Sequence, residues 1–318
     1  MAKVLIPQDI AEEGKAYLLE RGYEIKMGRG TSVEQLKEDV RDCEAILART
    51  AQIPREVILE GAKLKVIGRH GVGCENIDVE AATERGIWVT FTPEANAASV
   101  AEHTLGMIIA LGRSFLQAHT LTREGNWEGR NSLSAMDLEG KTLGLIGAGR
   151  IGSRVAQKAH AGLGMKVLFF DPQVKEIPGL PEALYAEDPL TIFRESDFVS
   201  LHVPVTPETR GAFGKSHFEA MKKGAFFINA ARGELVNEGD LFQALKEKRI
   251  AGAALDVFEK EPPGKDHPFF TLDNVILSPH SAALTKEALV RMALGAAMGI
   301  DEVLSGGRPR WGFNRIGE

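Results

Sequence analysis

The sequence predicts an α/β protein built from two doubly wound parallel-sheet domains with a cleft between them. Short apolar runs alternate with amphipathic stretches along the chain, which is the pattern of parallel strands joined by helical crossovers. The chain has 318 residues, more than one compact core usually spans. A glycine-rich turn at Gly147 opens the second half of the pattern.

Strand-like runs near the N-terminus predict a small first domain. They are Lys3–Ile6, Tyr23–Met27, Ala45–Ala48, Lys65–Gly68 and Ile87–Thr90. Amphipathic stretches such as Ile10–Arg21 and Val79–Arg85 lie between these runs and predict helices.

A long helix is expected over Ala97–Gln117, where apolar residues recur at helical spacing behind Asn96 as the N-cap. The polar stretch Thr122–Gly140 follows without a clear strand, and we interpret it as an arm. Trp127 in this arm predicts a contact between subunits.

A second series of runs predicts the second domain. The runs are Thr142–Ile146, Lys166–Phe170, Phe198–Leu201, Ala225–Asn229, Ala251–Leu255 and Val275–Leu277. Six parallel strands with intervening helices match a dinucleotide fold, and we class both domains as Rossmann-like or flavodoxin-like. The amphipathic segment Thr285–Leu304 has no following strand, and we place it on the first domain. The expected domains are therefore 1–98 plus 285–318, and 99–284.

Composition excludes several classes of protein. The net charge of −6 and the pI near 5.8 argue against nucleic acid or an anionic membrane surface as a partner. No apolar run has the length of a membrane span or the form of a signal-peptide core. The two cysteines, Cys43 and Cys74, lack metal-type spacing. We expect a cytoplasmic protein without a metal site.

The turn after Thr142–Ile146 reads Gly147-Ala-Gly149-Arg-Ile-Gly152 and precedes a helical pattern. One glycine allows the tight turn, one lets the backbone approach a pyrophosphate, and one packs helix against strand. The pyrophosphate then meets the helix N-terminus. Asp171 ends the next strand, 19 positions (171 − 152) beyond Gly152, where an acid binds a ribose 2′-hydroxyl and repels a 2′-phosphate. The pattern predicts NAD rather than NADP; the alternative for Asp171 is a solvated strand-end charge.

Ionisable residues follow the last three strands at the edge where such sheets bind ligands: Arg232, Glu261 and His280. We expect these strands to be neighbours beside the strand of the glycine turn. Histidine suits proton transfer to a carbonyl oxygen, a carboxylate stabilises its charged form, and a guanidinium grips a carboxylate. The predicted roles are acid/base for His280, its orienting partner for Glu261, and substrate anchor for Arg232. Taken singly, each has another interpretation: a turn residue, a surface charge or a cap. His202 ends a strand on the same edge and is expected to touch the cofactor.

The first domain offers an anion site after Lys65–Gly68. Glycines there allow a turn with inward-pointing amides, and we expect the amides of Val72 and Gly73 to hold a substrate carboxylate. Arg49, with Arg69 or His70, is expected to meet a second anionic group. The alternative is a plain strand–helix turn with solvated cations.

These motifs resemble the D-isomer-specific 2-hydroxyacid dehydrogenase family over essentially the whole chain. The matching segments are GRHGVGCENID (68–78), NAASVAEHTLGMIIALGR (96–113), GLIGAGRIG (144–152), LHVPVTPETR (201–210), INAARGELV (228–236), DVFEKEP (256–262) and SPH (278–280). The resemblance implies an oxidoreductase, a homodimer, a discontinuous substrate domain, and catalytic roles for Arg232, Glu261 and His280. It also implies a place for Asn96, Arg232 and His280 in substrate binding. Implied cofactor contacts are Gly147, Gly149, Arg150, Ile151, Gly152, Asp171, His202, Pro204, Thr209, Ala230, Ala231, Arg232, Asp256, His280 and Ala282.

Within the family, the segment Asn96–Glu102 is most similar to 3-phosphoglycerate dehydrogenases, for which Arg49 and Arg69 suit a phosphate. His70 and Leu284 depart from that pattern. The expected function is therefore NAD-dependent hydride transfer between 3-phosphoglycerate and 3-phosphohydroxypyruvate. The alternatives are a hydroxypyruvate or glyoxylate reductase and an NAD-binding regulatory scaffold without turnover.

Overall fold

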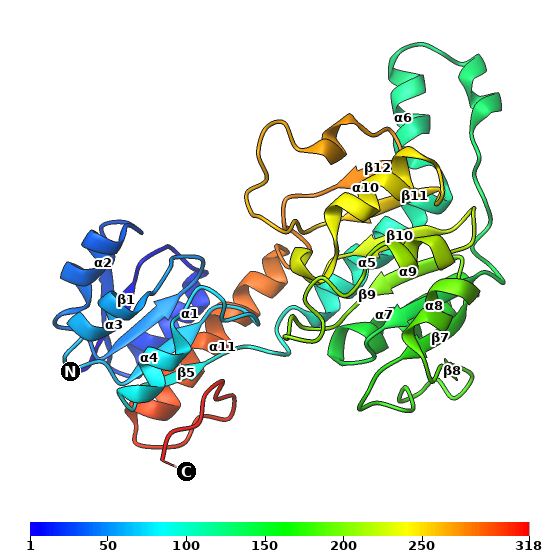
Figure 1. Cartoon of the computed structure of the whole chain (residues 1–318). Helices are drawn as coiled ribbons and strands as arrows, with labels where there is room; N and C mark the ends of the chain where they lie inside the picture. The colour runs from blue at the N-terminus through cyan, green and yellow to red at the C-terminus, as the bar shows by residue number, and fades with distance from the viewer. Residues whose placement is uncertain (318) are drawn as a thin grey trace. The chain divides into compact units, whose positions relative to one another are not determined.

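A computed structural model describes residues 1–317 of the chain, coloured by position in Figure 1. The chain divides into two compact units, one made of Met1–Asn96 with Ala283–Glu318 and the other of Ala97–Ala282. The boundaries lie two residues before the expected ones, at 96 rather than 98 and at 283 rather than 285.

The first unit contains a parallel sheet in the order β2-β1-β3-β4-β5. Its strands are β1 (Lys3–Ile6), β2 (Glu24–Met27), β3 (Ala45–Ala48), β4 (Val66–Arg69) and β5 (Trp88–Thr90). Alternation along β1 sends Leu5 into one apolar core and Val4 and Ile6 into the other. Both faces of this sheet are therefore covered.

Two helices cover one face of the first sheet, α1 (Glu12–Glu20) and α11 (Lys286–Leu304). A Cβ at Gly14 would lie 2.8 Å from the Cβ of Ala293, so glycine lets α1 and α11 approach this closely. The opposite core includes residues of α2 (Val33–Val40), α3 (Arg55–Glu60) and α4 (Val79–Glu84).

The second unit contains a parallel sheet of seven strands within the described residues, in the order β12-β11-β10-β9-β6-β7-β8. The strands are β6 (Thr142–Ile146), β7 (Lys166–Phe170), β8 (Leu184–Tyr185), β9 (Phe198–Leu201), β10 (Phe226–Asn229), β11 (Gly252–Leu255) and β12 (Val275–Leu277). The sequence prediction missed β8. It was also wrong to set β10 beside β6, because β9 lies between them.

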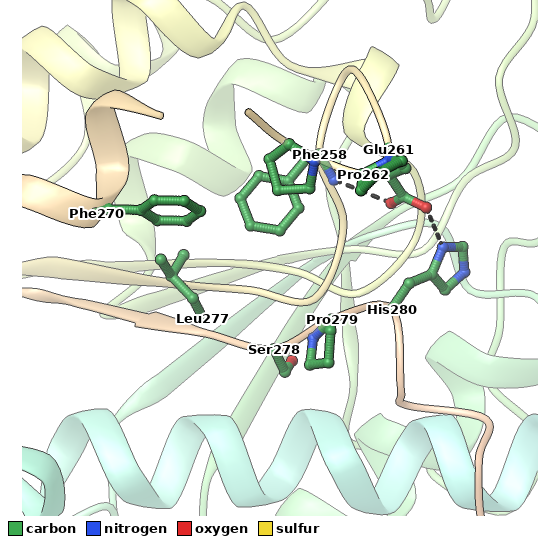
Figure 2. A pocket seen from close by; sticks show the side chains of 9 residues that line it. Phe258, Glu261, Pro262, Phe270, Leu277, Ser278, Pro279 and His280 are labelled. Carbon is green, nitrogen blue, oxygen red and sulfur yellow. Dashed lines mark hydrogen bonds and ion pairs between the residues drawn. The ribbon is translucent and has the colours of Figure 1, made fainter. Parts of the chain in front are cut away.

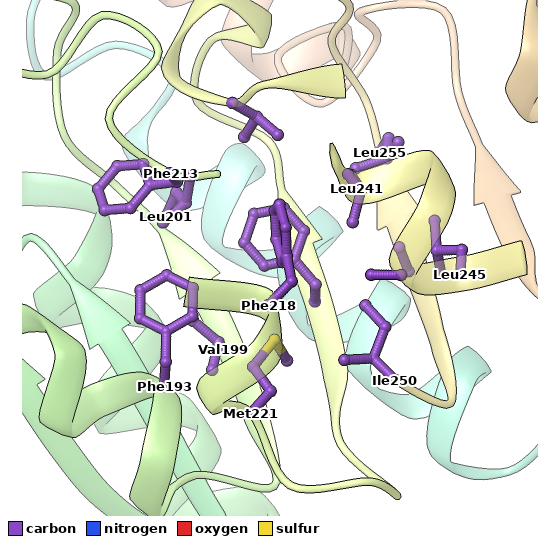
Figure 3. Packing of buried hydrophobic residues seen from close by; sticks show 14 of the residues in the cluster. Phe193, Val199, Leu201, Phe213, Phe218, Met221, Leu241, Leu245, Ile250 and Leu255 are labelled. Carbon is purple, nitrogen blue, oxygen red and sulfur yellow. The ribbon is translucent and has the colours of Figure 1, made fainter. Parts of the chain in front are cut away.

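Helices on the two faces of the second sheet enclose separate cores. One core contains residues of α5 (Ala97–Gly112) and α7 (Arg150–Leu163). The other contains residues of α8 (Pro189–Glu195), α9 (Lys215–Ala220) and α10 (Glu238–Lys246), including Phe193, Phe218 and Leu241 (Figure 3).

The expected single helix Ala97–Gln117 is wrong. Ser114 adopts a left-handed conformation with φ of 51° and separates α5 from α6 (Phe115–Arg123). The described residues of α6 and of the 3-10 turn η1 (Glu128–Ser132) include no buried ones. Trp127, between them, is 64% exposed. Helix α6 and the first part of the arm therefore present apolar side chains outside the core of their unit, whereas Leu138, near the end of the arm, belongs to that core.

Among residues 1–317, we find no helix long and apolar enough to cross a membrane.

Candidate active site

The strands β10, β11 and β12 bring their carboxyl ends to one level. Asn229 is paired with Leu255, and Leu255 with Leu277. The segments that follow these strands therefore begin side by side at one sheet edge, as the sequence predicts.

His280 and Glu261 contact each other at this edge (Figure 2). The Nδ1 of His280 lies 2.6 Å from the Oε2 of Glu261. The other carboxylate oxygen, Oε1, accepts a 3.1 Å hydrogen bond from the amide of Phe258. Burial acts to raise the pKa of Glu261, but its contacts with His280 and Phe258 and the charge of Arg232 outweigh burial and lower it. The pair is thus set up as a carboxylate facing an imidazole.

His280 is held in a strained turn. Its φ of 50° is left-handed, and its amide donates to the carbonyl oxygen of Asp256 at 2.7 Å. The Oδ1 of Asp256 accepts from the Ser278 hydroxyl at 2.6 Å and from the Ser281 amide at 2.9 Å, while Oδ2 accepts from the Ala282 amide at 2.9 Å. Asp256 is fully buried. Its carboxylate is therefore engaged in holding the His280 turn.

Sequence reasoning missed two residues of this network. The hydroxyl of Ser278 lies 3.2 Å from the Nε2 of His103, and His103 belongs to α5. The motif Ser278-Pro279-His280 contained a signal for Ser278, but nothing in the sequence joined α5 to it.

Arg232 lies directly after β10 in a turn shaped by the buried Asn229. The Asn229 side chain accepts from the Ala231 amide at 3.0 Å and donates to the Arg232 carbonyl oxygen at 2.8 Å. The guanidinium donates to the Ala231 carbonyl oxygen at 2.7 Å. Its charge helps lower the pKa of Glu261, so Arg232 acts electrostatically on the His280–Glu261 pair.

A cavity of about 410 Å³ adjoins the pair (Figure 2). Its lining residues are Phe258, Glu261, Pro262, Pro263, Phe270, Leu277, Ser278, Pro279 and His280. No lysine or arginine is among these described lining residues, and Arg232 lies outside the cavity. An anionic substrate needs a cation or amide donors, so this apolar cavity does not fit the expected substrate pocket.

The glycine turn has the geometry of a nucleotide cradle. Gly147 has φ of +99°, and a Cβ there would lie 2.5 Å from the His202 carbonyl oxygen. A Cβ at Gly152 would lie 2.1 Å from the Gly147 carbonyl oxygen. By contrast, no described atom lies within 4 Å of a Cβ built on Gly149. Protein packing requires the first and third glycines, whereas the second leaves backbone open at the start of α7, as a bound pyrophosphate requires.

Asp171 lies at the end of β7, next to this cradle. Its Oδ2 accepts from the Ala148 amide at 2.8 Å, and its Oδ1 accepts from the amides of Gln173 and Val174 at 2.8 and 2.9 Å. A cation lies nearby that the sequence analysis overlooked. The Lys175 ammonium donates to the Asp171 carbonyl oxygen at 3.4 Å and lies 4.1 Å from the centre of the Tyr185 ring.

The remaining expected cofactor residues lie in the same unit, at the start of α7 or in loops and turns. The Nε2 of His202 lies 3.0 Å from the Ser200 hydroxyl, and burial lowers the pKa of His202 to about 4. The Thr209 hydroxyl donates to the Pro204 carbonyl oxygen at 2.8 Å. Arg150 and Ile151 start α7, Ala230 and Ala231 follow β10, and Ala282 follows the His280 turn. The residues fit a dinucleotide, because the cradle and the strand-end acid lie at one edge.

The expected anion site of the first unit lies after β4. The Arg69 guanidinium folds over its own loop, donating to the carbonyl oxygens of Gly73 and His70 at 2.6 Å each. The amides of Val72 and Gly73 donate no hydrogen bond within the described chain. Burial, with the charges of Arg49 and Arg69, lowers the pKa of His70 to about 4. His70 therefore binds a proton less readily than a free histidine, and its place in an anion site stays a prediction.

Arg49 and Asn96 complete the expected substrate residues. The Arg49 guanidinium lies 3.4 Å from the carbonyl oxygen of Asp9. The Oδ1 of Asn96 is buried and has no hydrogen-bond partner among the described residues. We expected Asn96 to cap α5, but its side-chain oxygen does not do so. This acceptor stays unsatisfied among the described residues.

Comparison with known proteins decides the family. Residues 105–282 match the family described as D-isomer specific 2-hydroxyacid dehydrogenase, NAD binding domain. The chain belongs to the D-isomer-specific 2-hydroxyacid dehydrogenase family. It is 43% identical over 308 residues to a D-3-phosphoglycerate dehydrogenase of Methanocaldococcus jannaschii, covering 96% of this chain but 58% of that protein.

Other members of the family carry different names. A glyoxylate reductase of Thermofilum pendens is 41% identical over 283 residues, covering 87% of this chain and 83% of that protein. The solved structure of an NADPH-dependent glyoxylate/hydroxypyruvate reductase of Sinorhizobium meliloti has a TM-score of 0.87 at 28% identity, covering 98% of this chain and 97% of that one. The family is shared by enzymes that differ in substrate and cofactor.

No group of three or more His, Cys, Asp or Glu side chains in residues 1–317 is arranged to hold a metal ion.

Proposed function

We propose that this family member is an NAD-dependent oxidoreductase that interconverts 3-phosphoglycerate and 3-phosphohydroxypyruvate. The observation that carries the proposal is the 2.6 Å contact between His280 and Glu261 at the sheet edge that also holds the glycine cradle. A pair of this kind suits proton transfer at a carbonyl or hydroxyl oxygen.

His280 acts as the acid when the keto acid is reduced. Its Nδ1 faces Glu261, so its Nε2 is the nitrogen that gives a proton to the carbonyl oxygen, which becomes the hydroxyl. Glu261 stabilises the protonated imidazole before the transfer and fixes the ring orientation. In the reverse direction the neutral Nε2 removes the hydroxyl proton. The cofactor, when bound, supplies or accepts the hydride.

Arg232 anchors the substrate. A guanidinium binds a carboxylate through two parallel hydrogen bonds and polarises the adjacent carbonyl. Its position beside Asn229 keeps this donor at the same sheet edge as His280. The amides of Val72 and Gly73 are a second set of donors for an anionic group.

The choice of substrate has two supports. The phosphoglycerate dehydrogenase relative matches 96% of this chain, and Arg49 and Arg69 supply positive charge for a phosphate. Glyoxylate and hydroxypyruvate are the second candidates, because a glyoxylate reductase is nearly as similar, at 41% identity.

NAD is the proposed cofactor because the Asp171 carboxylate would repel the negatively charged 2′-phosphate of NADP. Asn96 is proposed to touch the substrate. Gly147, Gly149, Arg150, Ile151 and Gly152 are proposed to bind the pyrophosphate, and the other proposed cofactor contacts are His202, Pro204, Thr209, Ala230, Ala231 and Ala282. Asp256 was expected among them, but it is fully buried, so we propose that it acts through the His280 turn. A homodimer is proposed, with the exposed arm around Trp127 contacting the second copy.

The test is a spectrophotometric assay of NADH oxidation with phosphohydroxypyruvate, hydroxypyruvate, glyoxylate and pyruvate, repeated with NADPH. The proposal expects the highest kcat/KM for phosphohydroxypyruvate with NADH. A preference for glyoxylate or hydroxypyruvate selects the second candidates. NADH binding without turnover of any keto acid contradicts the enzyme and favours a regulatory scaffold.

A further inference from the structure

Glu261 is carried by a loop that has little structure of its own. The chain from Asp256 to His267, between β11 and the 3-10 turn Pro268–Thr271, contains no helix or strand. We call residues 259–267 the Glu261 loop. All its residues are exposed except Pro263 and His267, which are half-buried. Exposed backbone of this kind opens easily unless it is held by other contacts.

One carboxylate joins both ends of the Glu261 loop. The Oε1 of Glu238 accepts a 2.8 Å hydrogen bond from the amide of Glu259, the first residue of the loop. The Oε2 of Glu238 lies 3.1 Å from the Nε2 of His267, the last residue. The side chains of Glu238 and His267 are 19% and 14% exposed, so water competes little for this contact.

Glu238 belongs to the N-terminus of a helix, which fixes its backbone. It is the first residue of α10, and the preceding Asn237 caps this helix by accepting from the Asp240 amide at 3.0 Å. The carboxylate is therefore presented from a regular element to an irregular loop. A negative charge at this end of a helix is also favourable.

Two further contacts hold the loop ends in place. A Cβ at Gly233 would lie 1.9 Å from the carbonyl carbon of Phe258 and 2.3 Å from the Glu259 nitrogen, so the backbone after Arg232 packs directly on the start of the loop. At the other end, the His267 ring lies 5.3 Å from the ring of Phe258 and 5.1 Å from that of Phe269.

We propose that Glu238 is a positioning residue for Glu261: by binding both ends of the Glu261 loop, it holds the Glu261 carboxylate against His280 and keeps it in register with the Arg232 segment. The inference rests on the proposed function for the role of the His280–Glu261 pair. Glu238 touches neither residue directly. Its action runs through the loop backbone, because Glu261 is itself bonded to the amide of Phe258.

The test compares Glu238→Ala in two backgrounds, the natural chain and Glu261→Gln. Displacing a catalytic group by about 1 Å costs up to roughly a hundredfold, so Glu238→Ala is expected to lower kcat/KM by about ten- to a hundredfold in the natural chain. In the Glu261→Gln background its further effect is expected to be less than about twofold, since the positioned group is already gone. Equal losses in both backgrounds overturn the proposal.

Matched variants separate positioning from general damage. Glu247→Ala removes an exposed glutamate that follows the same helix and is expected to leave kcat/KM unchanged. His267→Phe keeps the aromatic packing but loses the Nε2 contact, and it is expected to repeat part of the loss. NADH affinity is expected to stay unchanged in Glu238→Ala, because the cradle is at Gly147–Gly152.

Two measurements do not require turnover. Amide hydrogen exchange of residues 258–267 is expected to quicken in Glu238→Ala and not in Glu247→Ala. Carboxyl NMR is expected to show the pKa of Glu261 rising toward its ordinary value, as its contacts with His280 and the Arg232 charge weaken. If no keto acid is reduced, the proposed function fails, while these measurements still decide whether Glu238 positions the Glu261 loop. Unchanged exchange or an unchanged Glu261 pKa overturns it.

Discussion

The Nδ1 of His280 and the Oε2 of Glu261 lie 2.6 Å apart, so the carboxylate engages one imidazole nitrogen, and Nε2 is the nitrogen that we propose acts on the substrate. The left-handed backbone of His280, with φ of 50°, is unusual for a residue with a side chain and costs energy. The hydrogen bonds of Asp256 offset this cost by fixing the turn.

Removing the imidazole is expected to remove the proton-transfer step. His280→Ala should lower kcat by about 10²–10⁴, the usual contribution of general acid–base catalysis. Steady-state oxidation of NADH with the best keto acid measures the change. His119→Ala, in the exposed helix α6, is the control, and near-normal turnover of His280→Ala would remove His280 from the mechanism.

Replacing the guanidinium tests substrate anchoring. Arg232→Lys keeps the charge but loses the planar fork, so kcat/KM should fall by about tenfold or more, mainly through KM. The same assay over a range of keto acid concentrations separates kcat from KM. An unchanged kcat/KM would contradict the anchoring role.

The glycine cradle offers two substitutions, and a third glycine outside it serves as their control. Gly149→Ala meets no described atom within 4 Å, so it should leave the melting temperature nearly unchanged and weaken NADH binding. Gly147→Ala has both a positive φ and a clash with His202, and it should destabilise the fold by about 1–3 kcal/mol. Gly162→Ala, later in α7, should stabilise by up to about 1 kcal/mol.

Melting curves and NADH fluorescence titration distinguish these effects. Equal NADH affinity in Gly149→Ala and the natural chain would show that no ligand group approaches this backbone.

The buried His70 is expected to make the free energy of unfolding depend on pH. Its pKa falls from the ordinary 6.5 to about 4 in the fold, so the unfolded chain binds a proton first as pH drops. The unfolding free energy should therefore decrease from pH 6.5 toward pH 4, and this contribution should level off below that value. Denaturant titrations at several pH values should show a flatter slope for His70→Phe than for His119→Phe.

Much of the fold could be predicted because its strands are short apolar runs bounded by polar turns. The strand β8 could not, since Leu184–Tyr185 is two residues long and has no periodicity to detect. Without β8, the run Phe198–Leu201 becomes the third strand of the second domain rather than the fourth. The usual strand order of a dinucleotide fold then wrongly places β10, instead of β9, beside β6. The missing strand does not change the adjacency of β10, β11 and β12. Glu261 and His280, which follow β11 and β12, therefore contact each other as predicted.

Other site features depend on contacts that no local pattern encodes. The left-handed Ser114 breaks a helix whose apolar spacing continues past it. Lys175 contacts the Tyr185 ring only because the chain turns back between them, although its bond to Asp171 is local. The bonds from His103 and Glu238 to their partners span 175 and 29 residues of sequence, so only the folded sheet brings them together.

Under the proposed function, the hydrogen bond from the Ala148 amide to Asp171 links the choice of cofactor to the affinity for it. The residue that we propose discriminates between the two dinucleotides also holds the glycine loop that we propose binds the phosphates. An attempt to redesign the enzyme for NADP by replacing Asp171 would loosen that brace, so a second change restoring the loop would have to accompany it.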